Sequence, residues 1–375
     1  MKFPFNKPAI VGNELDYIRD TVESGKISGD GKYTRKCQAF LEEHMRIPRV
    51  LLTTSGTSAL EMASLLLDIK SGDEVIMPSY TFVSTANAFA IRGAKPVFIE
   101  IRPDTLNLDE RLIEEKITEN TKAIVPVHYA GISCEMNAIM EIAHRREIRV
   151  IEDAAQAIGA SYHQKPLGSI GDLGALSFHE TKNIICGEGG ALLINNKQFI
   201  ERAEVIWEKG TNRKKFFRGE IDKYTWCDIG SSYLMSDILA AYLYAQLEKA
   251  NIIYQKRERI FNYYYDQLQP LEEKGKLRLP TIPEDSISNY HIFYILLNSR
   301  QERDTVLRKL KEAGILAVFH YIPLHLSPMG KRFGYRQGEF PVTEDLSGRL
   351  IRLPLYYSLP IEKAQIIISE IKKLM

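Results

Sequence analysis

One lysine of this 375-residue chain lies where its amine could act as a nucleophile. Lys182 falls in the polar turn 177–183, between the apolar runs 173–178 and 191–194, which we predict to be short buried strands. An amine held between buried strands is desolvated, and such amines can lose their proton near neutral pH and form Schiff bases. Taken alone, Lys182 fits a surface lysine in a hairpin better, because most lysines are exposed.

Three other groups follow predicted strands, at positions where parallel sheets bind ligands. The run Ser55-Gly56-Thr57-Ser58 opens a helix, whose free N–H groups and positive dipole end suit a phosphate. Phe82 could stack on a flat ring. Asp153 would need a cationic partner if it is buried. Each group also has an ordinary interpretation, respectively a helix N-cap, a core aromatic and a helix cap.

Together these sites supply the parts that pyridoxal 5′-phosphate requires. That cofactor needs a phosphate grip, a stacking ring, an anionic partner for its pyridine nitrogen and a lysine for its aldehyde. Gly56 with Thr57, then Phe82, Asp153 and Lys182, provide them in chain order on successive strand–helix units. We therefore predict a pyridoxal-phosphate enzyme.

A regular alternation of apolar strands and helices positions these residues. It indicates a mostly parallel sheet covered on both faces. Strands are predicted at 50–53, 74–77, 96–99, 123–127 and 149–152, with helices at 14–22, 58–67 and from Phe82 to Ile91. A long helix at 236–268 leads to strands at 289–296 and 316–319 and helices at 303–313 and after Pro360. The glycine-rich loop 24–31 is either a connector or a flap.

Composition narrows the class of protein. The chain is 45% hydrophobic with a formal net charge of +1, which allows a large core and two domains and gives no sign of nucleic-acid binding. No apolar stretch is long enough to cross a bilayer, and residues 1–6 lack the apolar core of a signal peptide. The four cysteines form no CxxC pair, so we expect reduced thiols in a cytoplasmic protein, without a metal site.

The chain resembles the DegT-type nucleotide-sugar aminotransferases over essentially its whole length. The segments that carry the resemblance are Thr-Ser-Gly-Thr-Ser-Ala-Leu (54–60), Pro-Ser-Tyr-Thr-Phe-Val-Ser-Thr-Ala-Asn (78–87), Val-Pro-Val-His-Tyr-Ala-Gly (125–131), Glu-Asp-Ala-Ala-Gln (152–156), Ser-Phe-His-Glu-Thr-Lys-Asn (177–183) and Gly-Glu-Gly-Gly (187–190). The family implies an α/β fold, type I of the pyridoxal-phosphate transferases. A large domain would hold a mostly parallel seven-stranded sheet, and a smaller α+β domain would follow.

This resemblance also implies boundaries and an assembly. We expect residues 1–30 to form an N-terminal segment, 31–250 the large cofactor-binding domain and 251–375 the small C-terminal domain. The family implies a homodimer with active sites near the subunit interface. Many relatives have an asparagine that reaches the neighbouring subunit's phosphate, with an arginine two residues later. Ser232 and Leu234 stand at those two positions here.

Individual roles follow from the family's motifs. They imply that Lys182 forms the Schiff base, Asp153 pairs with the pyridine nitrogen and Phe82 stacks on the ring. The remaining implied contacts are Gln156 near the ring's 3′-oxygen, Gly56, Thr57 and Ser177 on the phosphate, and His325 in the sugar pocket.

A narrower resemblance within the family concerns the substrate. Segments 24–31, 209–213, 222–226, 228–237 and 318–325 resemble members that transfer the amino group of L-glutamate to C4 of dTDP-4-keto-6-deoxy-D-glucose. The products are dTDP-4-amino-4,6-dideoxy-D-galactose and 2-oxoglutarate, for enterobacterial common antigen or a related surface polysaccharide. Lys209 and Arg213, with Lys26 and Lys223, are candidates for binding the pyrophosphate. For each of them singly, a solvated side chain is the simpler interpretation.

Several alternatives stay open. Residue types do not define which face of the sugar meets the cofactor, so the product could be the 4-amino gluco epimer or a 3-amino sugar. Family members with histidine at the Schiff-base position are sugar dehydratases, and Lys182 argues against that class. A non-catalytic regulator that binds pyridoxal phosphate is disfavoured by intact Lys182, Asp153, Gln156 and Thr57. An amino-acid aminotransferase would need a late arginine for its substrate's carboxylate; Arg352 is the only candidate, and we expect it at a small-domain strand end instead.

Overall fold

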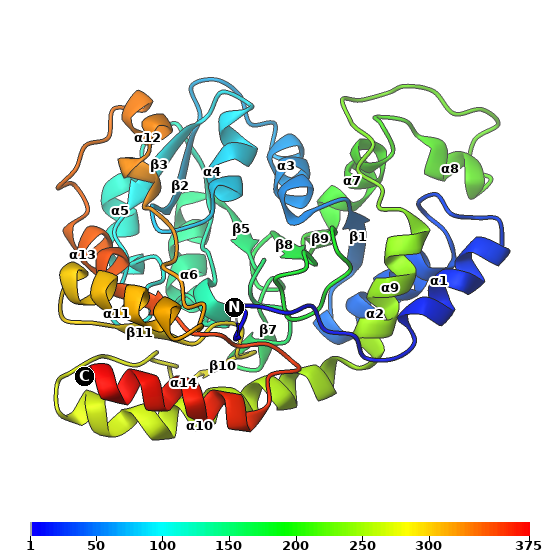
Figure 1. Cartoon of the computed structure of the whole chain (residues 1–375). Helices are drawn as coiled ribbons and strands as arrows, with labels where there is room; N and C mark the ends of the chain where they lie inside the picture. Colours follow the sequence, from blue (N-terminus) through cyan, green and yellow to red (C-terminus); the bar gives the residue numbers. More distant parts are fainter. Residues whose placement is uncertain (1) are drawn as a thin grey trace.

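A computed structural model describes residues 2–375, and its central feature is a seven-stranded sheet with helices on both faces (Figure 1). The strand order is β1-β9-β8-β5-β4-β2-β3, in which β9 is antiparallel to both of its neighbours and the other adjacent pairs are parallel. The predicted mostly parallel sheet of seven strands is therefore confirmed. Its strands are β1 (Arg49–Thr53), β2 (Glu74–Pro78), β3 (Lys95–Ile99), β4 (Thr121–Ile124), β5 (Arg149–Asp153), β8 (Leu173–Ser177) and β9 (Gly190–Ile194).

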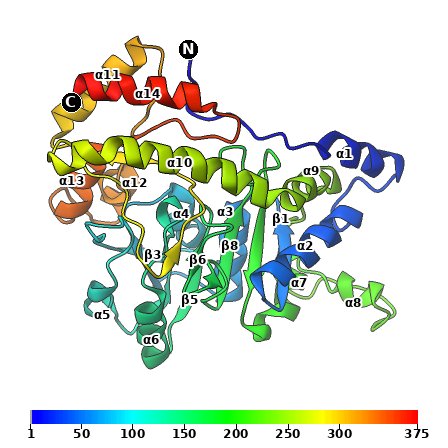
Figure 2. The same ribbon diagram turned by 90° about the horizontal axis from the view of Figure 1, so that it is seen from below.

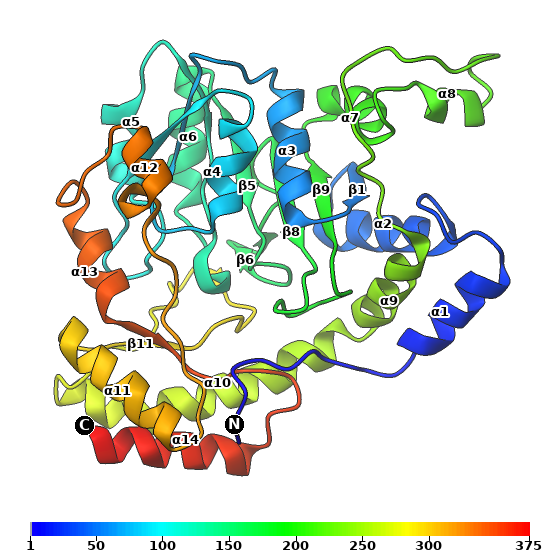
Figure 3. The ribbon, with the colours of Figure 1, turned by 45° about the horizontal axis from the view of Figure 1, so that its top comes forward.

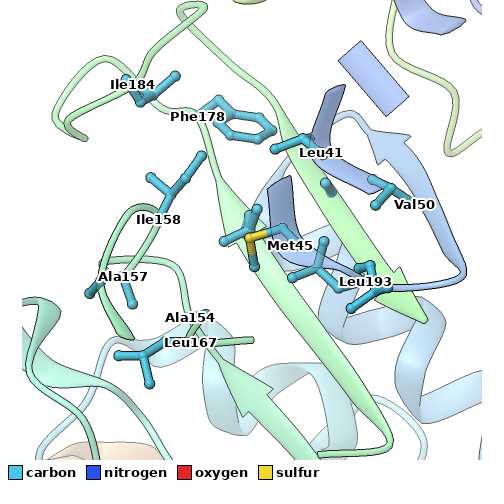
Figure 4. Close-up of a cluster of buried hydrophobic side chains, with 14 of the residues drawn as sticks. Leu41, Met45, Val50, Ala154, Ala157, Ile158, Leu167, Phe178, Ile184 and Leu193 are labelled. Carbon is cyan, nitrogen blue, oxygen red and sulfur yellow. The ribbon is translucent and has the colours of Figure 1, made fainter. Parts of the chain in front are cut away.

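The strands are apolar on both sides because helices cover both faces. One face packs against α2 (Lys32–Met45), α6 (Met136–Arg146) and α9 (Asp237–Glu248), and part of this core is drawn in Figure 4. The other face packs against α3 (Gly56–Leu66), α4 (Val83–Ala90) and α7 (Ile200–Trp207). Along β5, Val150 belongs to the first core and Ile151 to the second. This alternation continues into Glu152 and Asp153, whose side chains leave opposite faces.

The C-terminal region has a core of its own. It is built by α10 (Ala250–Glu273), α11 (Arg300–Glu312), α14 (Ile361–Leu374) and the pair β11 (Tyr294–Leu296) and β12 (Leu350–Arg352). Helices α10 and α14 run side by side (Figures 1 and 2). Phe3 also belongs to this core, and from there the N-terminal segment crosses to α1 (Glu14–Glu23), as Figure 3 shows. The predicted domain boundaries at residues 30 and 250 stay predictions.

Shorter elements complete the described chain. The helices are α5 (Ile113–Lys116), α8 (Arg213–Phe217), α12 (Pro328–Arg332) and α13 (Pro341–Arg349), and the strands are β6 (Ser161–Tyr162), β7 (Lys165–Pro166) and β10 (Ser286–Ile287). Four 3₁₀ turns are η1 (Glu110–Leu112), η2 (Tyr129–Gly131), η3 (Lys197–Phe199) and η4 (Leu324–Leu326). None of the helices within residues 2–375 is both long and apolar enough to span a membrane. Over the same residues, acidic, histidine and cysteine side chains form no cluster of three suited to a metal ion.

Three sequence predictions of secondary structure were wrong in detail. The single helix expected at 236–268 is divided into α9 and α10, because Lys249 leaves the helical conformation. The strand expected at 289–296 is reduced to β11, since Tyr290 has a left-handed φ of 55°. Residues 316–319 form only a single bridge, between Val318 and Arg352. The amphipathic helix α2 was not predicted at all.

Candidate active site

The residues that follow β1, β2, β5 and β8 line one cavity of about 540 Å³. This is within the usual range for small-molecule sites. Its wall includes seven of the predicted residues, namely Gly56, Thr57, Phe82, Asp153, Gln156, Ser177 and Lys182. The C-terminal region contributes His291, His320, Tyr321 and Arg352 to the same wall, and the N-terminal segment contributes Phe5. The structure therefore brings together side chains from three separate parts of the chain.

One end of the cavity is the first turn of α3. The Ser55 side chain accepts a hydrogen bond from the Ser58 N–H at 3.0 Å, which leaves the N–H groups of Gly56 and Thr57 available to a ligand. A Cβ at position 56 would lie 3.0 Å from Cβ of Ser177 and 3.2 Å from the carbonyl oxygen of Leu176. Glycine therefore allows the helix to begin this close to β8. This end has the free donors and dipole that a phosphate needs.

Asp153 ends β5, and its carboxylate is held from one side only. Its Oδ2 accepts a hydrogen bond from the Thr85 hydroxyl at 2.7 Å, and its Oδ1 accepts one from the Ala155 N–H at 3.1 Å. Thr85 is fixed in turn by a 2.7 Å contact with the Thr81 hydroxyl. Only 5% of Asp153 is exposed, and it lines the cavity with Lys182. A cation bound there would complete its coordination.

Lys182 lies in the turn between β8 and β9, as predicted, and is half-buried. Its N–H donates to the carbonyl of His179 at 2.9 Å. The next residue, Asn183, is buried and donates to the carbonyl of Asn289 at 2.7 Å, which fixes the turn against the C-terminal region. Burial lowers the pKa of the Lys182 amine to about 8; Asp153 opposes this shift, and Arg352 adds to it. A usable fraction of the amine is therefore neutral near physiological pH.

Between these groups lie flat and polar side chains suited to a planar ring. Phe82 is 55% exposed, and its ring centroid is 6.1 Å from that of Tyr321. Gln156 is held at both ends of its amide, since Oε1 accepts from the Ala130 N–H and Nε2 donates to the Tyr321 hydroxyl, each at 2.8 Å. The orientation of Gln156 is thus determined before any ligand binds.

His325 does not lie in this cavity, contrary to the sugar-pocket role that the motif implies. It is fully buried, with Nδ1 at 2.6 Å from the Ser79 hydroxyl and Nε2 at 3.0 Å from Glu344. These bonds use both ring nitrogens to join the end of β2 to α13. From the same motif, His320 and Tyr321 reach the cavity instead.

Lys209 and Arg213 lie in a second groove of about 880 Å³, apart from the cavity. Both pair with Glu208, at 3.0 and 3.2 Å. The groove also includes Lys26, Ser232 and Leu234, whereas Lys223 is exposed and lines neither hollow. Lys209, Arg213 and Lys223 belong to the segment around α8, which extends away from the sheet (Figure 1).

Several residues that line the cavity or, like Thr85, hold a wall residue from behind were not singled out from the sequence. Thr85 could have been found, because it follows Phe82 by three residues and so faces the same way from the start of α4. His291 gave no signal, since its approach depends on the left-handed backbone at Tyr290. Arg352 does end β12, as expected, but its side chain also lines the cavity. The expectation that it serves only a strand end was therefore incomplete.

Fold and cavity together define a pyridoxal-phosphate enzyme of fold type I, and the wall residues fit that cofactor. The first turn of α3 offers phosphate donors that a Cβ at position 56 would crowd, and Asp153 has an open side for a pyridinium. The family model "DegT/DnrJ/EryC1/StrS aminotransferase family" matches residues 8–372, and the chain belongs to this family. Aminotransferases of the family use pyridoxal phosphate, so the predicted cofactor and enzyme class are confirmed.

Similar proteins extend over the whole chain. An uncharacterized protein of Methanocaldococcus jannaschii is 36% identical, with 99% of this chain and 97% of that protein covered. The GDP-perosamine synthase of Escherichia coli O157:H7 is 32% identical, with 100% and 99% covered. Among solved structures, Spr1654 of Streptococcus pneumoniae in its PMP form superposes with a TM-score of 0.93 at 27% identity, over 99% of this chain and 98% of that one. The protein is thus a sugar aminotransferase that takes an amino donor and a keto-sugar.

Proposed function

We propose that this enzyme transfers the amino group of L-glutamate to C4 of dTDP-4-keto-6-deoxy-D-glucose, giving dTDP-4-amino-4,6-dideoxy-D-galactose and 2-oxoglutarate. The observation that carries the chemistry is one cavity in which an amine of lowered pKa, Lys182, lies with the buried carboxylate Asp153. The choice of sugar is supported by the segments at 209–213, 222–226 and 318–325, and the similarity to a GDP-perosamine synthase supports a nucleotide-linked substrate. The product would serve enterobacterial common antigen or a related surface polysaccharide.

Lys182 is the nucleophile and proton carrier of this proposal. Its pKa of about 8 places it close to the operating pH, where one group can serve as both acid and base. The turn that bears it is anchored through Asn183, so the amine can return to the same position after each transfer. When bound, the cofactor accepts the electrons left on carbon as a proton departs.

The other wall residues bind and orient. Asp153, aligned by Thr85, would hold a proton on the pyridine nitrogen, while Gln156 would contact the oxygen next to the reacting carbon. Gly56, Thr57 and Ser177 would hold the phosphate, and Phe82 would cover one ring face. A phosphate held there would keep a bound ring in one orientation beside Lys182.

In a homodimer, the groove around Lys209 and Arg213 would contribute to substrate binding. Phe217, Tyr224 and Trp226 near it are exposed, and exposed aromatic side chains are typical of protein interfaces. We expect the groove to meet the partner's cavity, where its cations would bind the nucleotide pyrophosphate. Ser232 would then take the place of the family's cross-subunit asparagine. Sedimentation of the purified protein tests the dimer.

The reaction is tested by product analysis. The protein, pyridoxal phosphate, L-glutamate and dTDP-4-keto-6-deoxyglucose are incubated together, and proton coupling constants of the isolated sugar are read by NMR. An axial C4 amine supports the proposal. An equatorial C4 amine, or an amine at C3, would retain the enzyme class and replace the product. If no amine forms although glutamate converts the bound cofactor to its amine form, the sugar is wrong, and a GDP-linked 4-keto sugar is tried next.

A further inference from the structure

His291 lines the same cavity as Lys182, and only 6% of this histidine is exposed. Its backbone is held from two sides. The carbonyl of His291 accepts a hydrogen bond from Arg257 Nη2 at 2.6 Å, and its N–H donates to Asn289 Oδ1 at 3.1 Å. The left-handed φ of 55° at Tyr290 turns the chain between Asn289 and His291. The backbone therefore places this imidazole in the cavity wall without the help of a ligand.

The tautomer of this imidazole follows from its contact with Asn183. The Asn183 amide donates from Nδ2 to the carbonyl of Asn289 at 2.7 Å, and a carbonyl can only accept, so the amide oxygen is the end that faces His291. That oxygen lies 2.9 Å from His291 Nδ1, which must therefore carry the proton. Burial lowers the pKa of His291 well below its usual value, and the charges of Lys182 and Arg257 lower it further, so the ring stays neutral. Its Nε2 is thus an acceptor without a proton.

Nε2 of His291 and the amine of Lys182 are complementary groups in one cavity. Within residues 2–375, neither atom has a hydrogen-bond or ion-pair partner. Neither is among the fully enclosed polar atoms that lack a partner, so both reach open space in the cavity. The amine can only donate to such a nitrogen, and the four-carbon side chain of lysine is flexible enough to bring it there.

The second imidazole of the cavity wall, His320, is a weaker candidate for this contact. Burial lowers the pKa of His320, and among the charges Arg352 lowers it more than Lys182 does. Burial again comes first for His291, but there Lys182 acts more strongly than Arg352. Because the effect of a charge falls with distance, His291 is the imidazole that faces the amine.

We propose that His291 is a positioning residue for Lys182: its Nε2 accepts one N–H of the amine whenever the amine is free, and so directs the lone pair of that nitrogen. This inference rests on the proposed role of Lys182, but on neither the amino donor nor the sugar. An amine that donates to one fixed acceptor no longer rotates freely about its Cε–Nζ bond, and oriented groups react faster than freely rotating ones. Asn183 holds the ring and adjoins Lys182 in the chain, so the acceptor stays in register with the turn that bears the amine.

Two substitutions separate the two nitrogens of the ring. The amide of asparagine can take the place of Nδ1, and the amide of the longer glutamine can take the place of Nε2. His291→Asn should therefore keep the contact with Asn183 and lose the acceptor, whereas His291→Gln should keep the acceptor and lose the contact. The thermal midpoint of the holoenzyme should fall in His291→Gln and stay near wild type in His291→Asn.

The rates should show the opposite order. With saturating L-glutamate, His291→Asn should slow the conversion of bound cofactor to its amine form by about 10- to 100-fold, because the amine is no longer oriented. The glutamate concentration at half-saturation should stay the same, since His291 does not bind the donor. His291→Gln should slow the conversion by less than about fivefold, because an acceptor remains. His163→Asn, at a surface histidine paired with Asp285, is the matched control.

Two measurements on the cofactor-free protein require neither donor nor sugar. Nitrogen NMR of the wild-type imidazole of His291 should show a protonated Nδ1 and an Nε2 without a proton. Acylation of Lys182 across the pH range should have a lower midpoint in His291→Asn than in wild type, because the protonated amine loses an acceptor that stabilises it. The midpoint in His291→Gln should remain close to that of wild type.

Three results would overturn the inference. A wild-type rate in His291→Asn together with a loss in His291→Gln would make the histidine only a structural support of the turn. A protonated Nε2 in the wild-type protein would remove the acceptor, and this result is obtained even if a variant fails to fold. An unchanged acylation midpoint in His291→Asn would show that the amine and the ring do not meet. If the wild-type protein fails to react with glutamate while the NMR and acylation results are as expected, the proposed donor is wrong and the inference stands.

Discussion

Glu152 and Asp153 are adjacent at the end of β5, yet the two carboxylates have opposite surroundings. On one face, Glu152 accepts four hydrogen bonds, from the N–H groups of Gly168, Ile170 and Gly171 at 2.6–2.8 Å and from His128 Nε2 at 2.9 Å. On the other face, Asp153 accepts two and borders the cavity. The protein satisfies the first carboxylate completely and leaves the second for a ligand to complete.

The two neighbouring carboxylates at the end of β5 therefore have different roles: Glu152 stabilises the fold, and Asp153 serves the chemistry. Because Cys134 donates its N–H to His128 Nδ1 at 3.2 Å, Nε2 of that ring carries the proton given to Glu152, and the network is closed. It fixes the loop at 168–171 and the segment after β4. On the other face, the Asp153 carboxylate can still accept a further partner after the protein has folded. The amine of Lys182 and the guanidinium of Arg352 line the same cavity. Unsatisfied buried charge is thus the property that distinguishes the functional face.

The largest effect is expected on the open face. Lys182→Ala should lower turnover by at least about 10,000-fold, because the amine is both nucleophile and proton carrier. The thermal midpoint of the cofactor-free protein should not fall, since the change removes a desolvated cation. Turnover of the nucleotide sugar and calorimetric unfolding measure the two quantities. Turnover within 100-fold of wild type would remove Lys182 from the chemistry.

The next effect is expected at the open carboxylate. Asp153→Asn should reduce turnover by about 1,000-fold, because a neutral amide no longer stabilises a protonated pyridine nitrogen. Its two remaining contacts, with Thr85 and the Ala155 N–H, are also available to an amide, so unfolding should shift by no more than about 1 kcal/mol. Steady-state kinetics and urea unfolding are compared on the same preparation. An intact turnover would show that the ring nitrogen has another partner.

The neighbouring substitution should have the reverse outcome. Glu152→Gln exchanges one acceptor oxygen for an NH₂ group that faces backbone donors, which should cost about 2–4 kcal/mol in the free energy of unfolding. Turnover per folded molecule should stay within about fivefold of wild type, since Glu152 does not line the cavity. Urea unfolding and active-site titration separate the two effects. A stable but inactive Glu152→Gln protein would break the contrast between the two faces.

Sequence was sufficient for the sheet and for residues that follow its strands. Gly56, Phe82, Asp153 and Lys182 each lie within about five residues of the end of an apolar run, and parallel strands bring such positions to one edge. Local pattern therefore carries spatial information in this part of the chain. The division between α9 and α10, and the turn at Tyr290, depend on contacts between distant segments and have no local signature.

The rest of the cavity wall could not be predicted from the sequence, because it too depends on contacts between distant segments. Phe5 and Arg352 lie in the two terminal regions of the chain, and they meet because Phe3 packs into the C-terminal core. His325 was misplaced because a motif identifies a segment and not the direction of each side chain. In that segment the left-handed φ of 52° at Tyr321 turns neighbouring residues toward different partners.

The smallest effect is expected on the titration of Lys182, which can be measured after substitution of either carboxylate. In the cofactor-free protein, acylation of the amine should follow a midpoint near pH 8, because burial lowers its pKa to about 8. The unfolded chain keeps this proton up to about pH 10.4. The folded protein therefore gains stability as the pH rises from about 8 toward that value, where the unfolded state binds more protons.

The charge of Asp153 raises the pKa of Lys182, so Asp153→Asn should move the acylation midpoint below pH 8. Glu152→Gln, on the far face, should leave the midpoint in place. Peptide mass spectrometry after timed acylation across the pH range reads the modification at Lys182 alone. Equal shifts in both variants would mean that the amine responds to the charge of β5 as a whole, and the functional distinction between its two faces would then be lost.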